Sequence, residues 1–89
     1  MYDLTIDNLV SALIEWTKGD MDSFTDDINE LIEECFEDSG ANNAKTTEDI
    51  KARRIIVVKG IMIKCLHELD HETTTRLEEQ LLAYVKTSA

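Results

Sequence analysis

Six carboxylate side chains recur at helical spacing between residues 26 and 37. They are Asp26, Asp27, Glu30, Glu33, Glu34 and Glu37. The segment 20–38 holds nine acidic residues and neither Lys nor Arg, and its apolar residues fall on the opposite face by the i, i+3, i+4 rule. Like charges at this spacing repel by about a few tenths of a kcal/mol per pair, so a purely structural helix usually carries Lys among them. The single-sign face predicts a surface that binds cationic groups of a partner.

A second pattern could hold a metal ion. His67-Glu68-Leu69-Asp70-His71 matches the H-E-x-x-H spacing of zinc metalloproteases. That chemistry needs two His one helical turn apart on zinc, a Glu that activates water, and a third ligand. The extended motif with a further Gly and His is absent, and the pattern lies where a helix should end. We therefore expect no metal, no cofactor and no enzymatic activity.

The basic residues of the chain cluster between positions 51 and 64. On a helix they do not share one face, whereas nucleic-acid binding needs one basic stripe. We expect them to pair with the acidic helix, inside the domain or across a dimer, and we expect no direct nucleic-acid binding. The cluster comprises Lys51, Arg53, Arg54, Lys59 and Lys64.

One ridge of the same segment is apolar. Ile56, Gly60 and Ile63, followed by His67, recur at i, i+4, i+7 and i+11, away from the main apolar arc. Two Ile flanking a Gly indicate a second contact surface, where Gly60 lets another helix approach. Two interpretations stay open: the ridge is a self-association seam, or a fourth helix packs on it inside the monomer.

Charge is distributed unevenly along the chain. Residues 1–44 hold twelve acids against Lys18 alone, giving −11, and residues 45–89 hold seven acids and eight bases, giving +1; together they make the net charge of −10. The acidic half repels nucleic acid and anionic membranes and attracts basic surfaces. The simpler interpretation is that the excess acid only keeps a small protein soluble.

Composition indicates a single small helical domain over residues 1–89. Pro is absent and there are three Gly, which disfavours a turn-rich all-β fold. The apolar runs are too short to cross a membrane. Two Cys make no disulfide framework, and both fall on apolar faces, so we expect reduced thiols and a cytoplasmic location.

Capping residues and apolar periodicity together predict four helices. Thr5 should cap a helix to about Lys18, closed by a left-handed Gly19; Ser23 should begin the acidic helix, which Gly40 ends. Thr46 should begin a third helix reaching Leu69, with Leu66 in its apolar arc. Residues 70–74 should form a break before a last helix capped by Thr75.

The third segment has one alternative. Residues 53–66 are rich in β-branched side chains, and Lys59-Gly60 could form the turn of a hairpin. Both faces of such strands would be apolar, and two lone strands are marginally stable. A helix with apolar residues over half its circumference fits better and would be central in a bundle.

These observations predict an all-α fold, a compact antiparallel bundle of about four helices with the third long and central. We expect a non-enzymatic module whose acidic helix contacts the basic surface of a nucleic-acid-binding protein, as an inhibitor would. In size and charge the chain resembles anti-restriction, anti-CRISPR and nuclease-immunity proteins of phages and other mobile elements, but no motif carries this resemblance. The alternative is a small regulatory or structural subunit that forms a homodimer through Ile56, Gly60 and Ile63.

Overall fold

The computed structural model describes residues 2–19 and 21–88. These residues form four α-helices and one short 3-10 helix and contain no strand, so the predicted all-α fold is confirmed. In chain order the elements are α1 (Tyr2–Thr17), α2 (Asp26–Asp38), η1 (Ala41–Asn43), α3 (Thr47–Cys65) and α4 (His71–Ser88). No helix among the described residues is long and apolar enough to cross a membrane.

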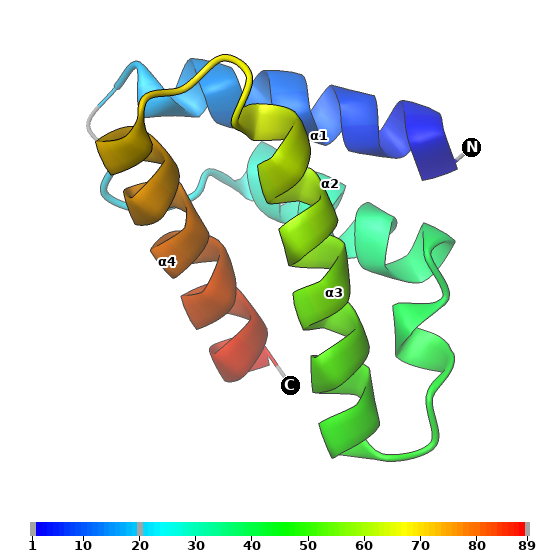
Figure 1. Cartoon of the computed structure of the whole chain (residues 1–89). Helices are drawn as coiled ribbons and strands as arrows, with labels where there is room; N and C mark the ends of the chain where they lie inside the picture. The colour runs from blue at the N-terminus through cyan, green and yellow to red at the C-terminus, as the bar shows by residue number, and fades with distance from the viewer. Residues whose placement is uncertain (1, 20, 89) are drawn as a thin grey trace.

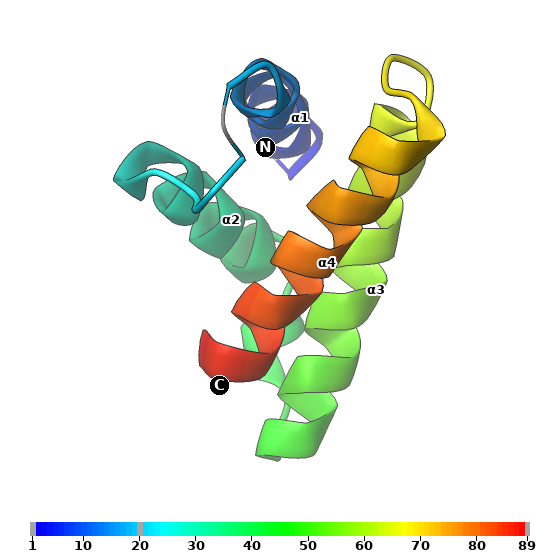
Figure 2. The ribbon, with the colours of Figure 1, turned by 90° about the vertical axis from the view of Figure 1, so that its left-hand side faces the viewer.

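The helices form two antiparallel pairs that cross each other. α1 packs against α2 and α3 packs against α4, with the first pair running across the upper part of the second (Figure 1). A view from the side places α2 and α3 toward opposite sides of the molecule (Figure 2). α3 is the longest helix, with 19 residues, and contacts α1, α2, η1 and α4, which confirms the predicted central position. The radius of gyration of 12.3 Å is that of a compact chain of this length.

One core joins the apolar faces of the helices. α2 contributes Ile28, Ile32, Cys35 and Phe36, and it therefore faces the core with the side opposite its carboxylates. Each fully buried large apolar side chain contributes about 1.5–3 kcal/mol relative to an exposed one. The largest fully buried side chains are Leu9, Leu13, Ile32, Phe36, Ile61, Leu77 and Leu81, with Val58, Val85, Cys35 and Cys65.

The predicted start of α1 is wrong, whereas its end, expected at about Lys18, is confirmed at Thr17. The helix already begins at Tyr2, and Thr5, expected as its cap, is buried and donates its hydroxyl to the carboxylate of Asp38 at 2.7 Å. This bond ties α1 to the end of α2. Gly19 does not adopt a left-handed conformation, whereas Met21, among the described residues of this connection, has a positive φ of 57°.

The residue that caps the start of the acidic helix is Thr25 and not Ser23. The Thr25 hydroxyl accepts a hydrogen bond from the Ile28 amide at 3.3 Å, while the Ser23 carbonyl accepts one from the Trp16 indole at 3.0 Å. The predicted end at Gly40 is confirmed, because this residue has a φ of 80°, which favours glycine.

Residues 53–65 are helical, so the hairpin alternative is wrong and the predicted third helix is confirmed. Thr46 caps α3 as predicted, accepting from the Asp49 amide at 3.1 Å. The helix ends at Cys65 instead of Leu69. Leu66, expected in the apolar arc, therefore lies in the following turn with 53% of its surface exposed.

The last helix begins earlier than predicted. Residues 71–74 belong to α4, and the carboxylate of Asp70, not Thr75, accepts the amide hydrogen bond of the first turn, from Thr73 at 2.7 Å. Hydrogen bonds from Thr73 lower the pKa of Asp70 below its ordinary value. The Thr75 hydroxyl instead donates to the carbonyl of His71 inside the helix.

Candidate functional site

The six predicted carboxylates form one outward face of α2, called here the acidic stripe (Asp26, Asp27, Glu30, Glu33, Glu34 and Glu37). Five of them are exposed, and Glu33 is half-buried. Asp26 and Asp27 lie in the first turn, where the helix dipole stabilises negative charge, whereas Glu37 lies in the last turn, where it does not. Within residues 2–19 and 21–88, none of the six carboxylates forms an ion pair.

Glu33 differs from the other five because it is held by α4. The Tyr84 hydroxyl donates a hydrogen bond to the Glu33 carboxylate. Burial and this bond raise the pKa of Tyr84 to about 12. The sequence carries no signal for this contact, since the two positions are 51 residues apart. Glu33 therefore positions α2 against α4 as well as contributing charge to the stripe.

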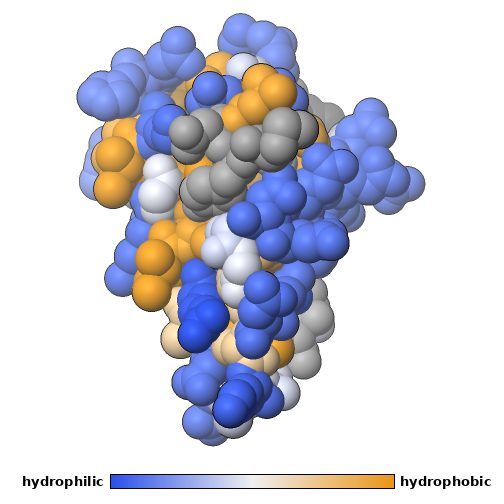
Figure 3. Space-filling view, turned by 90° about the vertical axis from the view of Figure 1, so that its right-hand side faces the viewer, coloured by the Kyte–Doolittle hydropathy of each residue, from blue (hydrophilic) through white to orange (hydrophobic). Residues whose placement is uncertain are grey.

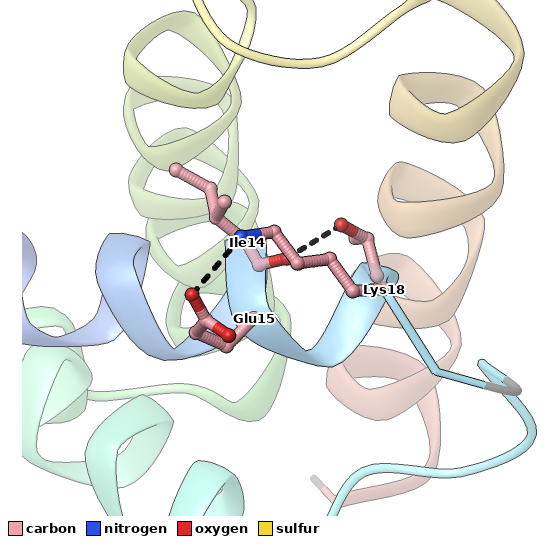
Figure 4. Close-up of polar contacts among 4 residues, drawn as sticks. Ile14, Glu15 and Lys18 are labelled. Carbon is pink, nitrogen blue, oxygen red and sulfur yellow. Dashed lines mark hydrogen bonds and ion pairs between the residues drawn. The ribbon is translucent and has the colours of Figure 1, made fainter.

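The only base of residues 1–44 does not neutralise the stripe. Lys18, in the turn after α1, pairs with Glu15 of α1, with its Nζ 3.1 Å from the Glu15 Oε1 atom. Figure 4 shows this ion pair at the end of α1. In the same turn the Thr17 hydroxyl donates a hydrogen bond to the carbonyl of Ile14 at 2.7 Å. Both groups of the ion pair are exposed, so the contact contributes little to stability.

The basic cluster of α3 approaches α2 through an aromatic ring and not through the stripe. Arg54 is buried, donates to the Asn42 side chain at 2.8 and 3.1 Å, and lies 5.0 Å from the centroid of the Phe36 ring. Lys64 pairs at 3.6 Å with Asp7 of α1. Among the described residues no ion pair joins this cluster to the acidic stripe, and pairing across a dimer stays a prediction.

The predicted ridge of α3 is open to solvent. Ile56 is 68% exposed and Ile63 62% exposed, and a Cβ built on Gly60 would meet no atom within 4 Å. We call Ile56, Gly60 and Ile63 the α3 ridge. α4 packs on another face of α3, so the alternative in which a fourth helix covers the ridge is wrong. Viewed from the side in Figure 3, apolar side chains reach the surface among hydrophilic ones.

Two open hollows, each of about 370 Å³, adjoin α3 near the two ends of the ridge. The first lies between α3 and the turn after α2, and is lined by Ile56, Val57, Arg53 and residues 38–41. The second lies between α3 and α1, and is lined by Lys64, His67, Glu68, Asp7, Val10 and Ser11.

The H-E-x-x-H pattern does not form its metal-binding geometry. His67 lies in the turn after α3, whereas His71 is the first residue of α4, so the two do not lie one turn apart on one helix. No group of three or more His, Cys, Asp or Glu side chains among the described residues could hold a metal ion.

Neither thiol is activated as a nucleophile. Burial, with nearby carboxylates, raises the pKa of both Cys35 and Cys65 to about 11, so both stay protonated at neutral pH.

In comparisons with known proteins, no family model, no curated protein and no solved structure matches the chain.

Proposed function

We propose that this chain is a non-enzymatic binding module that presents the acidic stripe to a basic surface of a nucleic-acid-binding protein. One observation carries the proposal. Five of the six carboxylates face solvent, and within the described residues none is neutralised by an ion pair. Their repulsion disfavours the free helix, and a cationic surface would relieve it.

The geometry of the stripe supports competition with a nucleic-acid strand. Carboxylates one helical turn apart are separated by about 5–6 Å, a distance of the same order as the spacing of phosphates along a strand. Lys and Arg side chains that contact successive phosphates could therefore contact successive carboxylates. The charge of −11 on residues 1–44 would steer the encounter.

The stripe is also held in place before binding. Ile32 and Phe36 fix the reverse side of α2 in the core, Thr25 caps its first turn, and Tyr84 holds Glu33. A pre-ordered surface loses less conformational freedom on association, so more of the interaction energy appears as affinity. The activity we propose is inhibition, in which the stripe occupies the channel that the partner uses for nucleic acid, inside the cell and away from membranes. Anti-restriction, anti-CRISPR and nuclease-immunity proteins have this size and charge.

The test neutralises the stripe without changing its shape. The variant Glu30→Gln/Glu34→Gln/Glu37→Gln spares Glu33 because of its contact with Tyr84. The control Glu68→Gln/Glu78→Gln/Glu79→Gln removes three exposed carboxylates elsewhere, so both proteins have net charge −7, from −10 plus three. Proteins of the source cell, freed of nucleic acid by nuclease, are captured on each immobilised protein, and the captured partner is then titrated in a duplex-DNA binding assay.

We expect the wild type and the control to capture a DNA-binding protein and to displace its DNA. The stripe variant should need at least about tenfold more protein for the same displacement, which corresponds to about 1.4 kcal/mol, and should show a weaker dependence on salt. Equal competition by the stripe variant would contradict the proposal, as would equal weakening by the control or capture of no nucleic-acid-binding protein.

A further inference from the structure

We propose that the hollow between α3 and the turn after α2 binds a free apolar α-amino acid in its zwitterionic form. We call it the α2–α3 hollow; it is lined by residues 38–41 with Arg53, Ile56 and Val57. This inference is independent of the proposed function, because none of the lining residues belongs to the acidic stripe. It rests on the size of the hollow, on two opposite charges that line it without pairing, and on its apolar side chains.

The size of the hollow suits one small molecule. Its volume of about 370 Å³ lies near the lower end of the roughly 300–1,000 Å³ that is usual for small-molecule sites. The turn after α2 packs beside α3 and forms one wall, while α3 forms the other (Figure 1). A single amino acid therefore fits, whereas a folded partner does not. Because the hollow is open to solvent, we expect binding to be weak.

Two opposite charges line the hollow without meeting. Arg53 is exposed and, among the described residues, forms neither a hydrogen bond nor an ion pair. Asp38 accepts the Thr5 hydroxyl at 2.7 Å through its Oδ2 atom and forms no ion pair with Arg53. A ligand that carries both a cationic and an anionic group can therefore contact both side chains at once. The ammonium and carboxylate groups of an α-amino acid are such a pair.

The second hollow of about 370 Å³, between α1 and α3, does not have this arrangement. Its lining also holds an acid and a base, Asp7 and Lys64, but these two pair with each other at 3.6 Å. A zwitterion would have to break that contact before it could bind. The opposite charges therefore favour the α2–α3 hollow as the site.

The end of α2 sets the orientation of the ligand. Asp38 is the last residue of this helix, where the helix dipole adds partial negative charge to that of the carboxylate. The ammonium group is attracted to this end. The carboxylate group is attracted to Arg53, whose planar guanidinium can donate two parallel hydrogen bonds to it.

Apolar side chains in the lining select the class of amino acid. Ala41 and Val57 are buried, whereas Ile56 is 68% exposed. An aliphatic side chain that covers Ile56 removes apolar surface of both molecules from water, which is favourable. We therefore expect leucine to bind more tightly than glycine, which has no side chain to place there.

The wall formed by the turn is held in place before binding. The Ser39 hydroxyl donates to the Phe36 carbonyl at 2.9 Å and accepts from the Ala41 amide at 3.3 Å. Arg54 of α3 donates to the Asn42 side chain at 2.8 and 3.1 Å, which ties the turn to the helix. A preformed wall loses little conformational freedom when the ligand binds.

The first test is a nuclear magnetic resonance titration of the isotope-labelled full chain with L-leucine. We expect saturable shifts of the amide signals of Gly40, Ala41 and Val57, with a dissociation constant on the order of 1 mM. Leucinamide lacks the carboxylate and N-acetyl-leucine lacks the ammonium, so each should bind about fivefold more weakly. Glycine should bind about tenfold more weakly. Absence of saturable shifts at these amides would overturn the proposal, as would leucinamide or N-acetyl-leucine binding as tightly as leucine.

The second test removes the guanidinium. Arg53→Gln changes an exposed side chain without a partner among the described residues, so circular dichroism and the melting temperature should stay those of the wild type. Leucine should bind this variant about fivefold more weakly. The control Arg76→Gln changes an exposed arginine of α4 and alters the net charge equally, and it should leave binding unchanged. Wild-type affinity of Arg53→Gln, or equal weakening by Arg76→Gln, would show that leucine does not bind through Arg53.

A third test uses two isoleucines of similar exposure. Ile56 lines the hollow and Ile63, 62% exposed, does not. Ile56→Ala should weaken leucine binding about threefold, whereas Ile63→Ala should leave it unchanged. Equal affinities of the two variants would overturn the assignment of the ligand's side chain to the α2–α3 hollow.

Discussion

The outward faces of α2 and α3 differ in chemical character and in the contacts that hold them in place. The face of α2 is charged throughout and is backed by buried residues, a helix cap and the bond from Tyr84. The face of α3 is apolar at its middle, and Ile56 and Ile63 project from a helix whose opposite side fills the core. One surface can act through long-range attraction, which salt weakens, and the other only through direct contact. A small chain can thus present two surfaces with different sensitivities to solution conditions.

The largest expected effect comes from the residue behind the acidic stripe. Phe36→Ala removes a fully buried ring that packs near Tyr84 and under Arg54, and should lower the free energy of unfolding by about 3–5 kcal/mol. The control Ile63→Ala, on the open ridge, should stay within about 0.5 kcal/mol of the wild type in dilute solution. Urea unfolding followed by circular dichroism measures both, and equal losses would contradict the assigned burial.

An intermediate effect is expected at the contact between α2 and α4. Tyr84→Phe removes the hydrogen bond to Glu33 and should cost about 0.5–1.5 kcal/mol at neutral pH. The pKa of Tyr84 is raised from 10.0 to about 12, so its contribution is fully present below pH 10 and is lost as the pH rises toward 12. Unfolding measured between pH 9 and 12 should therefore show the two proteins converging.

The cysteines do not obscure this comparison. The pKa values of Cys35 and Cys65 are raised from 9.0 to about 11. Ionisation of the thiols therefore lowers the free energy of unfolding equally in both proteins as the pH rises from 9 to 11. A difference between wild type and Tyr84→Phe that stays constant with pH would show that the phenol is not protected by folding.

Alanine is expected to have opposite effects at two glycines, and the smallest effect of the series is expected at Gly60. Gly60→Ala places a methyl group in open space on a helix and should raise the free energy of unfolding by about 0.5–1 kcal/mol, measured in dilute solution. Gly40→Ala should instead lower it by about 1–2 kcal/mol, because Gly40 has a φ of 80°. Destabilisation of the dilute monomer by Gly60→Ala would mean that the ridge is covered inside the chain.

The sequence predicted the helices better than their ends. Apolar periodicity over whole segments identified the helices and the exposure of the acidic stripe, because the buried face of a helix repeats along its length. Capping signals were ambiguous, since Thr5, Ser23, Thr46 and Thr75 are all suitable caps, and only Thr46 is used. The other three make different contacts: the Thr5 hydroxyl donates to Asp38, the Ser23 carbonyl accepts from Trp16, and the Thr75 hydroxyl donates to the His71 carbonyl.

Local sequence patterns could not predict the long-range contacts that shape the candidate surfaces. The bond from Tyr84 to Glu33 depends on how α4 crosses α2, and the sequence carries no signal for a pair so far apart. The open ridge was one of two alternatives, and the choice required knowing which face of α3 the last helix covers. Leu66 was misplaced because α3 ends at Cys65, before the turn that exposes it.

The two buried thiols can be used to measure how often the fold opens. Cys35 and Cys65 are each 0% exposed, and a thiol held protonated inside the core reacts with an alkylating reagent only when the structure opens. The rate of their modification in native buffer thus measures how often the helices separate. A third cysteine placed on the surface would be labelled long before either of them, which gives a selective point of attachment for a fluorophore or a solid support.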